Sequence, residues 1–168
     1  MTMKLVEADI TTLNLDAIVN AAHETLHRGG GVCGAIHAAA GPELERECMA
    51  KYPEGCEPGD AKITGGYNLP ARHVVHAVGP RWRDGKSGEE KTLENAYRQS
   101  LEVLVANGLK SIAFPAISTG IFGFPADRAA EIAVATVRTF RADHPDVQVT
   151  FCCRGDGNLA RYQALLPE

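Results

Sequence analysis

The chain has 168 residues, 45% of them hydrophobic, and this length predicts one domain that spans residues 1–168 and buries its own core. Its formal net charge of −4 argues against non-specific nucleic-acid binding, which needs a basic face to neutralise backbone phosphates. The five cysteines match neither a disulfide framework nor a zinc-finger spacing, so we expect reduced thiols, a cytoplasmic protein, no metal and no cofactor.

Short apolar runs along the chain predict strands, and none approaches the roughly twenty apolar residues that cross a membrane, so we expect no membrane partner. The predicted strands, in chain order, are residues 5–6, 17–19, 61–64, 73–78, 112–114 and 147–153.

Residues at helical spacing lie between these strands. Ile36, Ala39 and Ala40 mark a first helix, which Gly41-Pro42 is expected to end before another begins. The later helices are expected over residues 92–107 with Gly108 as the C-terminal cap, from near Pro125 through 129–140, and over 159–165. This alternation predicts an α/β fold with a mostly parallel sheet and helices on both faces.

A glycine run follows the strand at residues 17–19 and opens the first helix. Gly29, Gly30 and Gly31 let the unpaired N–H groups of the first helical turn approach a ligand without a Cβ in the way. The pattern therefore predicts an anion site, although a tight strand-to-helix turn explains it equally well if it stands alone.

A second loop repeats this layout. Residues 114–125 run from an apolar strand through Ser118, Thr119 and Gly120 to a proline that favours a helix start. Both loops follow parallel strands, and the carboxyl ends of parallel strands meet at one edge of the sheet. The two loops together predict one site for two phosphates.

Asp9 follows the first predicted strand and belongs to the same edge of the sheet. Its carboxylate can accept a hydrogen bond from an exocyclic amine such as that of adenine. Capping of the turn at Thr11-Thr12 is an equally good explanation from spacing alone.

Several motifs in this order resemble the macrodomain family, specifically its MacroD-type branch. The resemblance extends over nearly the whole chain. The motifs are Ala8-Asp9-Ile10-Thr11, Asp16-Ala17-Ile18-Val19-Asn20-Ala21-Ala22, Gly29-Gly30-Gly31-Val32, Ala35-Ile36-His37, Val75-His76-Ala77-Val78-Gly79-Pro80 and residues 114–123.

The resemblance implies a three-layer α/β/α domain that binds ADP-ribose over the carboxyl edge of its sheet. It implies that Asp9 and Ile10 contact the adenine, and that Asn20 lies at the distal ribose. The remaining implied ligand contacts come from the two glycine loops: Gly30, Gly31, Val32, Ser118, Thr119, Gly120, Ile121 and Phe122.

Members of the MacroD-type branch hydrolyse the ester that joins ADP-ribose to Asp or Glu side chains, and many deacetylate O-acetyl-ADP-ribose. The resemblance therefore implies ADP-ribose, O-acetyl-ADP-ribose or mono-ADP-ribosylated proteins as partners. The chain departs from the family where His23 replaces an asparagine, Cys33 replaces an aspartate and Arg28 shortens the glycine run, but it keeps His37. The candidate catalytic residues are His23, Cys33, Asn20 and His37.

These departures leave three hypotheses open. Cys33 and His23 can act as base and orienter, or as nucleophile and base, because a helix N-terminus and an imidazolium both lower a thiol pKa. Alternatively, a ligand phosphate activates water and His23 helps weakly. In the third, Cys33 is an inert filler, His23 binds ribose, and the domain reads ADP-ribose marks without cleaving them.

Other aromatic and histidine residues have simpler explanations. We expect His73 and His76 to serve packing and hydrogen bonding within a strand. We expect Trp82 to be a half-buried anchor rather than a stacking platform for bases. Phe122 and Phe124 are better placed for the ligand: we expect one of them along the distal ribose and the other near the adenine or in the core.

Overall fold

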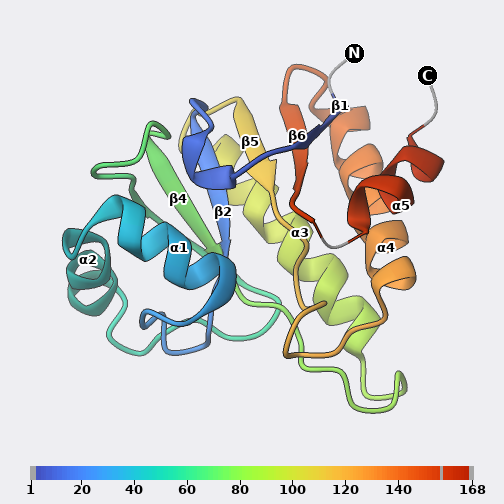
Figure 1. Ribbon diagram of the computed structural model, residues 1–168, viewed down its shortest axis with the longest axis horizontal. Helices are drawn as coiled ribbons and strands as arrows, with labels where there is room; N and C mark the ends of the chain where they lie inside the picture. The colour runs from blue at the N-terminus through green and yellow to red at the C-terminus, as the bar shows by residue number, and fades with distance from the viewer. Residues whose placement is uncertain (1–2, 156, 167–168) are drawn as a thin grey trace.

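The computed structural model describes residues 3–155 and 157–166, and its centre is one twisted sheet (Figure 1). The strand order is β1-β6-β5-β2-β4-β3, and every neighbouring pair is parallel except the edge pair of β3 and β4. The strands are β1 (Met3–Glu7), β2 (Ala17–Ala21), β3 (Ala61–Gly65), β4 (His73–Ala77), β5 (Ser111–Phe114) and β6 (Gln148–Cys153).

Helices cover both faces of this sheet, which confirms the expected α/β/α layering. One face carries α1 (Gly31–Ala40) and α2 (Glu43–Lys51). The other carries α3 (Glu89–Ala106), α4 (Ala126–Asp143) and α5 (Asn158–Leu165), and a short 3-10 helix, η1 (Ile10–Thr12), follows β1. No helix among the described residues combines the length and apolarity that a membrane crossing requires.

The two core layers arise because successive side chains of a strand point to opposite faces. In β2, Val19 packs with the core under α3 and α4, whereas Ile18 packs with the core under α1. The same alternation separates Cys152 from Cys153, which belong to opposite core layers. The two neighbouring thiols therefore lie on opposite faces of the sheet.

Most of the glycine and proline residues that were predicted to begin or end helices lie at helix boundaries. Gly41 is the C-cap of α1, Pro42 is the N-cap of α2, and Gly108 follows α3 with a φ of 72°. Pro125 is the N-cap of α4 rather than its first helical residue.

The third helix begins at Glu89, one turn before the predicted start at residue 92. The buried Glu89 carboxylate accepts hydrogen bonds from the backbone N–H groups of Arg83, Asp84, Gly85 and Ser87, at 2.8–3.1 Å. Burial by itself raises the pKa of Glu89, but these hydrogen bonds outweigh it and lower the pKa to about 2. The carboxylate therefore organises the loop between β4 and α3.

Parallel strands β1, β2 and β5 end at the same edge of the sheet, as predicted. Beyond that edge lie Asp9, the glycine loop that leads into α1, and the loop between β5 and α4. The fold thus brings the three polar segments singled out from the sequence to one side of the molecule.

Candidate functional site

A cavity of about 250 Å³ lies at the carboxyl ends of β2 and β5. It is lined by both glycine loops, including Gly30, Cys33, Ser118 and Phe122. A second cavity, of about 650 Å³, is lined by Asp9, Ile10, Thr119 and residues near the start of α5. The two cavities form one cleft because they share four lining residues: Gly31, Val32, Ala116 and Gly120.

The first wall of the cleft is the N-terminal turn of α1. The N–H of Gly34 donates to the Gly30 carbonyl at 3.0 Å, which is the first bond of the helix. The N–H groups of the three residues before it, Gly31, Val32 and Cys33, make no hydrogen bond within the described chain. These free donors and the positive end of the helix favour an anion.

The opposite wall is the loop between β5 and α4. The Phe124 N–H donates to the Ser118 carbonyl at 2.9 Å and the Gly123 N–H donates to the Gly120 carbonyl at 3.0 Å, so the loop is closed on itself. Among the described residues, the N–H groups of residues 119–122 have no partner. Ile121, at the tip, is 92% exposed although it is apolar.

Ser118 is held in a strained conformation on this wall. Its φ is 70°, a region that non-glycine residues seldom adopt, and its buried Oγ has no hydrogen-bond partner among residues 3–155 and 157–166. Strain and an unused buried hydroxyl tend to occur together at functional sites. The sequence did predict Ser118 as a donor, but it did not predict its backbone geometry.

Gly79, two residues after the end of β4, makes this arrangement possible. A Cβ at residue 79 would lie 2.1 Å from the Ser118 Oγ and 2.5 Å from Cγ2 of Ile117. Only glycine allows so close an approach of the two loops. Gly79 lines the cleft, and sequence reasoning missed its role, although it lies in one of the motifs that carry the family resemblance.

His23 and Phe122 both line the first cavity. The His23 ring meets the Phe122 ring edge-on, with centroids 6.4 Å apart. The guanidinium carbon of Arg81 lies over the Phe122 ring, 4.8 Å from its centroid. A Cβ at Gly29 would lie 2.3 Å from Nε2 of His23, so the glycine makes room for the imidazole. Phe124 is instead buried against Trp82, as the anchor interpretation of Trp82 predicts.

Cys33 and His23 line the same cavity, but no hydrogen bond joins them in the described structure. The Cys33 thiol donates to the His27 carbonyl at 3.8 Å, and its sulfur accepts from Nδ2 of Asn20 at 3.6 Å. The geometry thus gives Cys33 an amide neighbour rather than an imidazole base.

Asn20 and His37 are buried behind the cleft and are not among the residues that line either cavity. Burial lowers the pKa of His37. Within the described part of the chain, Oδ1 of Asn20 and Nε2 of His37 have no hydrogen-bond partner. The predicted catalytic residues therefore fall into two layers, with His23 and Cys33 on the wall and the other two beneath it.

Asp9 adopts the capping geometry that was one of its two predicted roles. Its Oδ1 accepts from the backbone N–H and the hydroxyl of Thr11, at 3.0 and 2.7 Å. Its other oxygen pairs with Arg154 at 2.6 Å. The Thr11 hydroxyl, then the Thr11 N–H and Arg154, lower the pKa of this carboxyl, so it is ionised at neutral pH.

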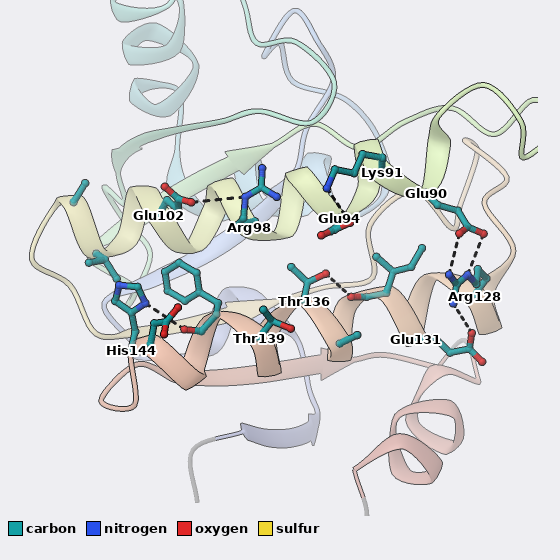
Figure 2. Close-up of a pocket in the computed structure, with 16 residues that line it drawn as sticks. Glu90, Lys91, Glu94, Arg98, Glu102, Arg128, Glu131, Thr136, Thr139 and His144 are labelled. Carbon is teal, nitrogen blue, oxygen red and sulfur yellow. Dashed lines mark hydrogen bonds and ion pairs between the residues drawn. The ribbon is translucent and has the colours of Figure 1, made fainter.

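A larger hollow, of about 870 Å³, lies between α3 and α4 (Figure 2). Arg128 pairs with Glu90 and Glu131 at 2.9 and 3.0 Å, and Lys91 and Arg98 pair with Glu94 and Glu102. On this surface, the α3–α4 groove, most of the charged side chains are paired with one another. We therefore assign the candidate site to the cleft. Among the described residues, no group of three or more His, Cys, Asp or Glu could hold a metal ion.

Comparisons with known proteins identify the family of the chain. A family model described as Macro domain matches residues 19–133. An Escherichia fergusonii protein named O-acetyl-ADP-ribose deacetylase is 52% identical over 168 residues, covering 98% of this chain and 94% of that protein.

Two solved structures show the same fold. The Oceanobacillus iheyensis macrodomain with ADP has a TM-score of 0.91 and 40% identity, covering 96% of this chain and 88% of its own. The Trypanosoma brucei macrodomain in complex with ADP-ribose has a TM-score of 0.89 and 40% identity, covering 98% of this chain and 68% of its own. The chain described here therefore belongs to the Macro domain family.

Proposed function

We propose that this chain, as a single domain of the MacroD-type branch, binds ADP-ribose in the cleft and hydrolyses ADP-ribosyl esters. The substrates would be O-acetyl-ADP-ribose or proteins with mono-ADP-ribosylated Asp or Glu side chains. One observation carries the binding part: unpartnered N–H groups of residues 31–33 and 119–122 line opposite walls of one cleft. Such paired donors suit a diphosphate, because each wall can neutralise one phosphate group.

The dimensions and chemistry of the cleft support the rest of the ligand. The adenosine half would lie in the larger cavity, where Asp9 and Ile10 are available to the base. Asp9 would accept from the adenine amine with a carboxylate that stays ionised, while Arg154 and Thr11 keep it in place. The distal ribose would lie in the smaller cavity beside His23, Cys33 and Phe122.

The proposed hydrolysis adds water across the ester, so that the acid departs and the ribose hydroxyl of ADP-ribose is regained. The residues that line the smaller cavity, all of them described, include no carboxylate to activate that water. The phosphate of the bound ligand would accept the proton of the water, and His23, exposed at the cavity, would help to orient it. The name of the 52% identical bacterial relative supports this activity class.

A non-catalytic reader of ADP-ribose marks is the second candidate. The observation in its favour is the environment of Cys33, whose hydrogen bonds go to His27 and Asn20 and not to His23. A thiol without a base contact is a poor nucleophile near neutral pH. In this alternative the cleft binds the ligand and leaves its ester intact.

Calorimetry and a turnover assay separate the two candidates. Micromolar binding of ADP-ribose with release of acetate from O-acetyl-ADP-ribose supports the hydrolase, whereas binding with both ester substrates intact after prolonged incubation supports the reader. An absence of ADP-ribose binding contradicts both.

Two variants then divide the mechanisms. If the ligand phosphate activates water, Cys33→Ala should retain most turnover, and His23→Ala should lower it by about tenfold. Loss of turnover in Cys33→Ala alone would instead support a thiol role.

A further inference from the structure

A buried chain of polar side chains starts at the wall of the cleft and ends on the far side of β4. Cys33 contacts Asn20, and Nδ2 of Asn20 lies 3.1 Å from Nδ1 of His76. Nε2 of His76 lies 2.9 Å from Oγ1 of Thr64 on β3. Asn20, His76 and Thr64 are each at most 2% exposed.

The hydrogen bonds from Asn20 through His76 to Thr64 all run in one direction. An amide nitrogen only donates, so Nδ1 of His76 must accept from Asn20 and its proton must lie on Nε2. The Nε2–H then donates to the Thr64 hydroxyl, which in turn donates to the Gly65 carbonyl at 3.1 Å. The neutral Nε2–H tautomer satisfies every contact of the ring.

The surroundings of His76 keep the ring neutral. Burial, and then the neighbouring His37 of α1, lower the pKa of His76 to about 3, and Glu47 of α2 opposes this only weakly. The other titratable group in contact is Cys48 of α2, whose sulfur lies 3.7 Å from Nε2. Burial raises the pKa of Cys48 to about 12, so it is an uncharged thiol. None of these groups changes the direction of the hydrogen bonds near neutral pH.

We propose that His76 is a positioning residue: through the side-chain amide of Asn20, it fixes the sulfur of Cys33 at the wall of the cleft. By accepting one N–H of the amide, the imidazole sets the plane of Asn20 and directs its Nδ2 toward Cys33. His76 itself does not line the cleft, so it acts only through Asn20. The inference deepens the proposed function, because Cys33 would face the distal ribose, but the contacts that carry it are independent of any ligand.

Two matched substitutions test the two ends of the ring separately. In His76→Asn the new carbonyl oxygen takes the place of Nδ1, so the acceptor for Asn20 is kept and the bond to Thr64 is lost. In His76→Gln the longer side chain reaches the position of Nε2, so the bond to Thr64 is kept and the acceptor for Asn20 is lost. Both variants remove the buried ring, so each serves as the control for general loss of packing.

The readout is the rate at which iodoacetamide alkylates Cys33 at pH 8, measured on the Cys33 peptide by mass spectrometry. The hydrogen bond from Asn20 holds the sulfur in one position at the wall of the cleft, and the reagent must reach it there. We expect His76→Gln to lower the rate by about threefold or more relative to His76→Asn, which should stay within about twofold of the wild type. Equal rates in the two variants would overturn the proposal.

A second measurement uses the unmodified protein and so does not depend on how the variants fold. Long-range ¹H–¹⁵N spectra report which ring nitrogen carries the proton. We expect His76 to be protonated at Nε2 only, from pH 6 to pH 8, with or without ADP-ribose. A proton on Nδ1 would mean that Asn20 presents its oxygen to the ring and would refute the proposed direction. Neither measurement requires turnover or ligand binding, so failure here is distinct from failure of the proposed function.

Discussion

The cleft and the α3–α4 groove differ in how their polar groups are used. The groove is the larger hollow, yet Arg128 already pairs with Glu90 across it and with Glu131 on its own helix (Figure 2). The cleft has free backbone donors on two walls, a buried hydroxyl without a partner at Ser118 and an exposed apolar residue at Ile121.

This difference shows that unused hydrogen-bonding capacity marks a binding site better than volume does. Buried or confined polar groups without partners cost free energy, so a stable fold retains them where a ligand satisfies them. Paired surface ions, by contrast, add little stability and leave little for a ligand to gain. Substitutions in each of the two regions test this contrast.

The largest expected effect comes from filling the cleft at Gly30. Its backbone is extended, with a φ of −95°, and a Cβ there meets no atom within 4 Å, so Gly30→Val should fold normally. The added side chain occupies space that the ligand needs. We expect ADP-ribose affinity by calorimetry to fall by about tenfold or more, with the melting temperature within about 2 °C of the wild type. Unchanged affinity would remove Gly30 from the ligand site.

Glu89 represents the opposite case, a buried carboxylate whose oxygens are fully used by four backbone N–H groups. In Glu89→Gln the amide NH₂ faces those donors, so we expect a melting temperature about 4 °C lower or more at pH 7.

The effect of Glu89→Gln should also depend on pH. The folded-state pKa of Glu89 is about 2, below the ordinary value of 4.5. The ionised carboxylate therefore stabilises the fold above pH 4.5 and loses this contribution as the pH falls from 4.5 toward 2. The difference in melting temperature between wild type and variant should narrow over that range, and a constant difference would contradict the assignment.

Ile121 tests the apolar part of the cleft. Because its side chain is 92% exposed, Ile121→Ala should leave the free energy of unfolding within about 0.5 kcal/mol of the wild type. If the ligand covers this side chain, the substitution should weaken ADP-ribose binding by about 1 kcal/mol, or roughly fivefold. Thr139→Ala, in the α3–α4 groove, is a control that should not change the affinity.

The smallest effect is expected in the α3–α4 groove. Arg128→Ala removes the pairs with Glu90 and Glu131, but the arginine side chain is 48% exposed. We expect the free energy of unfolding to fall by less than about 1 kcal/mol, less still at high salt, with ADP-ribose affinity unchanged. A clear loss of affinity would show that the groove communicates with the cleft.

Much of the fold was predictable because its signals are local. Short apolar runs predicted the strands, and Gly41-Pro42 and Gly108 predicted helix ends that the structure confirms. The two donor loops were also predictable, because glycine and hydroxyl residues directly after a strand supply donors from their own backbone N–H groups and side chains.

The features that escaped prediction depend on contacts between distant segments. The close approach of Gly79 to Ser118 joins two loops that are separated in sequence. The burial of His37 arises only when α1 packs on the sheet, and the link from Asn20 to His76 arises because the pairing of β2 with β4 sets these two residues opposite each other. No periodicity of the chain encodes these distances, and the spacing of His23 and Cys33 likewise did not reveal which neighbours they contact.

The most direct test of the central claim is a titration of ¹⁵N-labelled protein with ADP-ribose, followed by backbone amide signals. The account predicts that the signals of residues 31–33 and 119–122 shift together and saturate at one equivalent, while those of Glu90, Arg98 and Arg128 in the α3–α4 groove stay in place. If the ligand binds and the signals of both cleft segments stay unshifted, or if the groove signals shift instead, the claim that free amides of two loops bind a diphosphate is wrong.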